Sequence, residues 1–180
     1  VTSGPGAANT VTGIMTAYMD SVPMIVITGQ SVRGMLGKDA FQEADIFNLT
    51  MPIVKHSYLL KSANDIPRVV KEAYHIATTG RPGPVLIDVP KDVGTELCTA
   101  ALDAEMNLPG YKPEKRGYLP ETLDFIADAL AKAKRPVIIA GHGAALSRAE
   151  KELRELAEKL QIPVTSTLLG KGVFPDSHKL

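Results

Sequence analysis

The sequence predicts an α/β fold, in which a doubly wound parallel sheet is followed by the start of a second, Rossmann-like α/β domain. Short, uninterrupted apolar runs at 24–27 and 84–87 are typical of strands that are buried on both faces. Helical apolar periodicity over 66–77 lies between these runs, as in a crossover between parallel strands. The alternation of helix and strand resumes after a stretch rich in proline and glycine, which indicates a second unit.

The first unit is expected to span residues 1–94. It should begin with the tail of a strand at 1–3 and a tight turn at Gly4-Pro5-Gly6. A helix of about four turns is expected next, because four apolar residues recur at helical spacing and form one buried face. These residues are Val11, Ile14, Met15 and Tyr18.

The next expected elements are a strand over 24–28, a short helix over 41–49 and an extended segment over 53–60. Asn64-Asp65 offers an N-cap for a longer helix that Gly80 ends. The core-facing stripe of this helix is expected to be Ile66, Val69, Val70, Ala73, Ile76 and Ala77. The following buried strand, 84–89, ends at Pro90-Lys91-Asp92.

Residues 95–119 are expected to be an interdomain linker, because proline, glycine and charged residues leave no apolar periodicity there. The second unit, 120–180, should contain a helix around 123–130 and strands over 136–140 and 162–165. Ser147 and Glu150 form the pattern of a capping box. The helix that they would start has an expected core side made of Ala149, Leu153, Leu156, Ala157 and Leu160.

Composition argues against several classes of protein. Twenty basic and 20 acidic residues give zero net charge without a long block of either sign, so neither nucleic acid nor a membrane is an expected partner. The lone Cys98 suits a reducing compartment, and the four histidines are too scattered for a transition-metal site. No apolar run approaches the roughly 20 residues of a membrane span.

The most informative stretch runs from Gly29-Gln30 to Asp39-Ala40-Phe41-Gln42-Glu43, directly after a predicted buried strand. Ligands of open α/β sheets bind at the carboxyl ends of strands, although an ordinary surface crossover loop would show the same pattern. The glycine-rich turn at 4–6 can hold an anion or a polar ring at a helix N-terminus, or simply start the helix. Gly141-His142-Gly143 follows a strand and could meet a pyrophosphate, but alone this signal is weak.

As a set of strings, these residues resemble the large, catalytic subunit of the acetolactate (acetohydroxyacid) synthase family, whose members depend on thiamine diphosphate. The matching strings are Gly4-Pro5-Gly6-Ala7-Ala8-Asn9, Gly29-Gln30, Asp39-Ala40-Phe41-Gln42-Glu43-Ala44-Asp45, Gly80-Arg81-Pro82-Gly83-Pro84-Val85, Pro90-Lys91-Asp92 and the run from Ile162 to Gly170. The resemblance covers nearly all of the chain and is weakest between 94 and 118. The Asp-Ala-Phe-Gln-Glu string is the one most particular to this family.

The resemblance assigns the first unit to the C-terminal part of a pyrimidine-binding domain and the second to part of a middle, FAD-binding domain. It implies that Gly4, Pro5, Gly6 and Asn9 line the aminopyrimidine ring of thiamine diphosphate, with Pro5 and Asn9 closest. The family has Thr where Ala8 stands, a departure that removes a hydroxyl group but keeps the turn.

Three residues are implied to act near the bound 2-oxoacid. The amide of Gln42 can both donate and accept hydrogen bonds without trapping a charge. Phe41 would exclude water from the site, and the alternative is that it is a core aromatic. Lys91 would attract an anionic 2-oxoacid, and the alternative is that it is an exposed loop lysine. Glu43 and Asp45 are expected to be solvated or structural. Val32 and Arg33 fall in the segment that lines the family's substrate channel; many plant and fungal members have Pro where Val32 stands.

The resemblance also implies an FAD site made of Arg81, Gly141, Gly143, Thr167 and Leu168. A guanidinium group suits a phosphate or the edge of a flavin. Many members have Gly where His142 stands, so no side-chain role is expected for that histidine. In this family the flavin is structural and takes no net part in redox chemistry.

The expected function is therefore that of an acetolactate synthase, which condenses pyruvate with a second 2-oxoacid for branched-chain amino-acid biosynthesis. The chain begins without Met and is expected to be a fragment of a larger protein. The resemblance implies that the Mg2+ and diphosphate ligands lie outside it, so the fragment itself is expected to be inactive. The implied assembly is a homodimer or tetramer of catalytic subunits with a small regulatory subunit, cytoplasmic in bacteria and organellar in eukaryotes. A glyoxylate carboligase, a pyruvate oxidase or a non-catalytic paralogue is the alternative.

Overall fold

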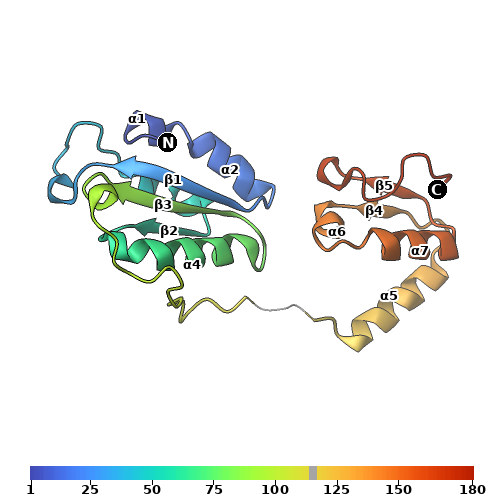
Figure 1. The fold of residues 1–180 in the computed structure, drawn as a ribbon. Coiled ribbons are helices and arrows are strands. Elements are labelled where there is room, and N and C mark those ends of the chain that lie inside the picture. The colour runs from blue at the N-terminus through green and yellow to red at the C-terminus, as the bar shows by residue number, and fades with distance from the viewer. Residues whose placement is uncertain (114–116) are drawn as a thin grey trace. The chain divides into compact units, whose positions relative to one another are not determined.

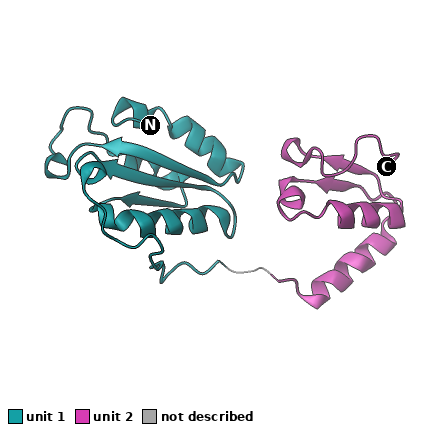
Figure 2. Ribbon diagram, viewed as in Figure 1, with its two compact units in different colours: residues 1–115 teal, residues 116–180 magenta. Residues whose placement is uncertain are grey.

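The computed structural model describes residues 1–113 and 117–180, and the chain divides into two compact units, 1–115 and 116–180 (Figures 1 and 2). Residues 114–116 of the predicted linker lie outside the described residues. Each unit contains a parallel sheet, so the predicted α/β class is confirmed.

The sheet of the first unit has the strand order β1-β3-β2, with β1 at Met24–Gln30, β3 at Pro84–Pro90 and β2 at His56–Leu59. Both pairings are parallel, and β3 is the central strand. The carboxyl ends of the three strands therefore lie at one edge of the sheet, and the loops that follow them meet there.

Helices cover both faces of this sheet. The side chains of β3 alternate between the two faces, because successive residues of a strand point to opposite sides. Leu86 packs with the buried Ile14 of α2 (Val11–Met19) and Ile46 of α3 (Ile46–Thr50). Val85 and Ile87 pack instead against α4 (Ile66–Thr78), and Figure 1 shows α2 and α4 on opposite sides of the sheet.

In the first unit, the extent of burial differs from the prediction in three places. The apolar run in β1 is not fully buried, and Ile27 is 55% exposed, because β1 is an edge strand. Met15 of α2 and Val70 of α4 are also exposed. The predicted stripe of α4 otherwise holds, with Val69, Ala73, Ile76 and Ala77 buried and Ile66 partly buried.

The N-terminal region differs in its details. Residues 1–3 are not a regular strand, but the amino group of Val1 donates to the Ile27 carbonyl at 2.8 Å and the Gly29 amide donates to the Val1 carbonyl at 3.0 Å. The predicted long helix is interrupted and forms as α1 (Pro5–Ala8) and α2. The helix expected over 41–49 is limited to α3, because residues 39–43 form a loop.

Part of the predicted linker is attached to the first unit along α4. The Asn64 side chain accepts hydrogen bonds from the backbone amides of Thr99 and Ala100, at 2.7 and 3.0 Å. The Asn107 amide donates to the buried Glu72 carboxylate at 2.6 Å, and Tyr111 packs against the α4 core. That 95–119 as a whole connects two domains stays a prediction.

The second unit contains α5 (Pro120–Lys132), β4 (Ile138–Ala140), α6 (His142–Leu146), α7 (Glu150–Leu160) and β5 (Val164–Ser166). Its two strands are parallel. The predicted capping box is wrong: Ala149 is the N-cap of α7, and the Ser147 hydroxyl donates to the Gly143 carbonyl at 2.8 Å as part of the end of α6. Among the described residues of both units, 3-10 turns form at Arg33–Met35, Met51–Ile53, Ala63–Asp65, Val93–Thr95 and Leu168–Gly170.

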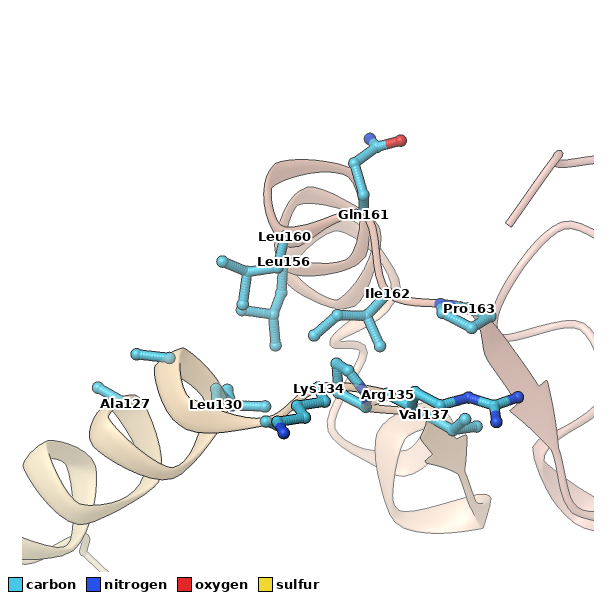
Figure 3. Close-up of a pocket in the computed structure, with 13 residues that line it drawn as sticks. Ala127, Leu130, Lys134, Arg135, Val137, Leu156, Leu160, Gln161, Ile162 and Pro163 are labelled. Atoms are coloured by element: carbon cyan, nitrogen blue, oxygen red, sulfur yellow. The ribbon is translucent and has the colours of Figure 1, made fainter.

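The predicted core side of α7 is only partly buried. Ala157 is buried, whereas Leu156 and Leu160 are more than two-fifths exposed. These leucines, with Leu130 of α5 and Ile162, line a pocket of about 970 Å³ between α5, α7 and the start of β4 (Figure 3). Among the helices that the structure describes, none has the length and apolar character needed to cross a membrane.

Candidate functional site

The fold brings together two of the predicted site motifs, the turn at Gly4 and the loop that carries Gln42. Gly4 has a positive φ of 58° with ψ at −120°, a backbone conformation that favours glycine. A Cβ atom placed on it would lie 2.8 Å from the Gln42 carbonyl oxygen and 2.9 Å from the Gln42 Cα. Only glycine fits this approach, because any side chain would force the two segments apart.

The loop that carries Phe41 and Gln42, residues 37–45, is tightly folded. Asp39 and Gln42 have positive φ angles of 53° and 54°, which non-glycine residues adopt only where the surroundings hold them. The Glu43 carboxylate accepts hydrogen bonds from the Gly37 amide and, at 2.9 Å, from the Ala40 amide. Both hydrogen bonds lower the pKa of Glu43, and the bond from the Gly37 amide has the larger effect. As expected, Glu43 has a structural role.

A buried polar network that no motif predicted lies at the base of this loop. The Asp88 side chain of β3 accepts from the Thr28 hydroxyl at 2.7 Å and from the Gln30 side-chain amide at 2.9 Å. The same Gln30 amide donates to the Ala44 carbonyl at 2.7 Å. Asp88 is 1% exposed, and burial raises its pKa. The sequence feature that could have predicted this network is a carboxylate within a strand that is expected to be buried on both faces.

The two side chains proposed to face the substrate are open to solvent. Phe41 is 89% exposed, so the alternative that it is a core aromatic is wrong. Gln42 is exposed, and its side-chain amide makes no hydrogen bond to the residues that the structure describes. Asp45 caps α3 by accepting from the Asn48 amide at 3.1 Å, which is the structural role expected of it.

Lys91 is exposed just beyond β3, where its backbone amide donates to the Gln30 carbonyl at 3.1 Å. The neighbouring Asp92 pairs with the Arg33 guanidinium at 2.7 Å, and this hydrogen bond lowers the pKa of Asp92. Arg33 also binds Glu96 and the Lys61 carbonyl. Arg33 therefore links the loops that follow all three strands, and its guanidinium hydrogen bonds go to residues of these loops.

The remaining residues proposed to bind the pyrimidine ring flank the Gly4 turn. Pro5 is exposed at the start of α1, and Gly6 is half-buried beside Thr2. Asn9 is exposed and lines a cavity of about 400 Å³ between the start of α2 and β1. The ring-binding set is therefore spread along α1 and is not gathered in one enclosed pocket.

The candidate flavin residues of the second unit lie at the carboxyl ends of β4 and β5. The Thr167 amide donates to the Ala140 carbonyl at 2.9 Å, and a Cβ on Gly141 would lie 3.8 Å from the Thr167 hydroxyl oxygen. Space is open around Gly143, and Leu168 is 88% exposed. Gly170, the last residue of the matching run that begins at Ile162, packs its backbone against the Ala140 carbonyl.

Arg81 belongs to the first unit, where its guanidinium donates to the Ser21 hydroxyl at 2.7 Å and to the Met19 carbonyl at 3.0 Å. It thereby fixes the end of α2. Across the described parts of the chain, no group of three or more His, Cys, Asp and Glu side chains could hold a metal ion.

Two family models match the chain. One is described as the N-terminal TPP (thiamine pyrophosphate, that is, thiamine diphosphate) binding domain of thiamine pyrophosphate enzymes and covers residues 1–49. The other is the central domain of thiamine pyrophosphate enzymes and covers residues 123–180.

The chain is also similar to curated acetolactate synthases. It is 52% identical to the acetolactate synthase large subunit of Mycobacterium tuberculosis, over 99% of this chain and 29% of the relative. It is 51% identical to the acetolactate synthase of Arthrospira platensis, over 99% of this chain and 31% of the relative. The large subunit from Lactococcus lactis subsp. lactis is 52% identical over the whole chain and 31% of the relative. The chain thus spans less than a third of the length of these relatives.

Proposed function

Because the chain belongs to the thiamine pyrophosphate enzyme family, we propose that it is part of an acetolactate synthase large subunit. The complete protein decarboxylates pyruvate and joins the resulting two-carbon unit to a second 2-oxoacid. The product is 2-acetolactate or 2-aceto-2-hydroxybutyrate, which are precursors of branched-chain amino acids. Identities of about 50% with three acetolactate synthases support this function over that of another enzyme of the same family.

The observation that carries the proposal is the close approach of the Gly4 turn to the backbone of Gln42. It supports a site in which a planar ring rests on a side-chain-poor turn while an amide-bearing loop reaches the reacting carbons. Thiamine diphosphate, when bound, supplies the nucleophilic carbon that decarboxylation and condensation require. Gly4, Pro5, Gly6 and Asn9 would hold its pyrimidine end.

The exposed groups of the loop suit the substrate side of this chemistry. The Gln42 amide would donate to a carboxylate or enolate oxygen, or accept from a hydroxyl group, without adding a charge. Phe41, which is almost fully exposed, would exclude water once substrate is bound. Lys91 would attract the carboxylate of the 2-oxoacid to this edge of the sheet.

The test is product analysis with the complete protein that contains this chain. Pyruvate is expected to give acetolactate only when both thiamine diphosphate and a divalent metal ion such as Mg2+ are present. Acetate as the main product, or turnover without metal, would contradict the proposal. The 180-residue chain itself is expected to be inactive, since we propose that the metal and diphosphate ligands lie outside it.

We further propose a structural FAD that is bound by Arg81, Gly141, Gly143, Thr167 and Leu168. The proximity of Gly141 and Thr167 supports this site. In the complete protein, Arg81→Ala should weaken FAD binding roughly ten- to more than a hundredfold, as expected for the loss of a charge-assisted hydrogen bond. A flavin fluorescence titration measures this affinity.

Ser21→Ala is the matched control, because it removes the Arg81–Ser21 hydrogen bond but keeps the guanidinium. Equal FAD affinity in the two variants, both folded by circular dichroism, would refute a direct role for Arg81.

Assembly and location are proposed on the same basis. Two of the relatives are named as large subunits, which supports a catalytic subunit that pairs with a small regulatory one. We propose a homodimer or tetramer of catalytic subunits, located in the cytoplasm in a bacterium and in an organelle in a eukaryote. Light scattering of the complete protein after size-exclusion chromatography would test the assembly, and a monomer would contradict it.

A further inference from the structure

The buried network at the base of loop 37–45 contains a carboxylate, that of Asp88, to which the chemistry above gives no task. We propose that Asp88 and Gln30 are positioning residues, which hold the loop in the conformation that presents Phe41 and Gln42. The structural part of this inference stands on the network alone. Its consequence for turnover rests on the proposed function.

The first argument is that the Gln30 side chain has one defined orientation. Its amide nitrogen donates to Asp88 at 2.9 Å and to the Ala44 carbonyl at 2.7 Å. Its oxygen accepts from the Ser31 amide at 2.8 Å. Both N–H groups and the oxygen are therefore used, and a flipped amide would place like groups against each other.

The second argument is that Asp88 is itself fixed. The Thr28 hydroxyl holds one carboxylate oxygen at 2.7 Å, while Gln30 holds the other. Asp88 and Thr28 lie directly opposite each other in the pairing of β3 and β1. Both side chains are at most 1% exposed, so the anchor belongs to the rigid part of the sheet.

The third argument is that the loop needs an anchor. Asp39 and Gln42 both have positive φ angles, a conformation that non-glycine residues keep only where the surroundings determine it. Glu43 closes the loop internally by binding the Gly37 and Ala40 amides. Gln30 ties the next residue, Ala44, to the sheet, so the loop is fixed both within itself and to its base.

The structural arm of the test is amide hydrogen exchange, measured by NMR on the 180-residue chain. Gln30→Met keeps the length of the side chain but removes its hydrogen bonds. The amides of Gly37 and Ala40 should then exchange about tenfold faster, which is the effect of losing about one hydrogen bond. The amide of Leu86 at the centre of β3 should be unchanged. Loop exchange at the wild-type rate would overturn the inference.

Two further variants separate positioning from general destabilisation. Asp88→Asn keeps an acceptor for Gln30 and can donate to the Thr28 hydroxyl, so loop exchange should stay within about twofold of wild type. Glu72→Gln is the matched control, because it changes a buried carboxylate on α4, at the opposite face of the sheet, in the same way. It should weaken the ion pair between Arg68 and Glu72 and leave the loop unchanged. If Glu72→Gln speeds exchange of the loop amides as much as Gln30→Met does, the inference is also overturned.

The catalytic arm uses the complete protein and a double-mutant cycle. If Gln30 acts through the loop, Gln30→Met should lower kcat about tenfold, and its effect should largely disappear in the Gln42→Ala background. A merely structural role would lower thermal stability and give additive effects on kcat, which would contradict positioning. If the wild type makes no acetolactate, the proposed function fails, and the exchange arm alone decides whether Gln30 and Asp88 position the loop.

Discussion

The contact between Gly4 and Gln42 can be tested by replacing Gly4 with alanine. Two costs arise at this position. An L-residue at this φ of 58° and ψ of −120° costs about 1–3 kcal/mol. The added Cβ would also lie within 3.0 Å of three backbone atoms of Gln42, and relieving such overpacking costs about 1–3 kcal/mol more. Gly4→Ala should therefore destabilise the first unit by about 2–6 kcal/mol.

Gly37→Ala separates the two costs, because Gly37 has a φ of 76° but nothing within 4 Å of its added Cβ. It should cost only about 1–2 kcal/mol. Urea unfolding followed by tyrosine fluorescence reports on the first unit, since four of the five tyrosines lie in residues 1–115 and the chain has no tryptophan. If Gly4→Ala costs no more than Gly37→Ala, the close approach of the two segments is refuted.

Two further predictions concern the first unit. Lys55→Met should lower its free energy of unfolding by about 1–3 kcal/mol, because the Lys55 ammonium donates to the Ile76 and Thr79 carbonyls at the end of α4; an unchanged urea midpoint would contradict this. The second concerns Glu43, whose pKa is lowered in the folded chain by the Gly37 and Ala40 amides. Its contribution to stability is present above the unfolded pKa of about 4.3 and is lost as the pH falls through the lower, folded pKa. NMR titration should show the Gly37 and Ala40 amide shifts moving below about pH 4.3 in the wild type and flat in Glu43→Gln, and the same movement in both would refute the capping role.

The sheet could be predicted because strand and helix periodicities are local properties of the sequence. The strand β3 and most of the buried stripe of α4 formed where apolar runs predicted them. The depth of burial could not be predicted equally well, because it depends on which elements lie alongside. Ile27 in the edge strand β1 and Leu160 of α7 have the predicted pattern and are still half exposed.

The site was predictable as a set of motifs but not as a geometry. The strings around Gly4 and Gln42 are visible in the sequence, whereas their contact depends on how the chain returns to the same edge of the sheet. The hydrogen bonding of Asp88 could not be predicted from local sequence, because its partner Thr28 is 60 residues away. The roles of Gln42, Phe41 and Lys91 stay predictions until a ligand is bound.

The most direct test of the account is hydrogen–deuterium exchange of the complete protein with and without thiamine diphosphate and Mg2+. If the Gly4 turn and the loop that bears Gln42 flank the cofactor, peptides over 4–9 and 37–45 should gain protection together. Peptides over α4, on the opposite face of the sheet, should not change. Cofactor binding that protects neither segment, or that protects α4 instead, would contradict the proposed site.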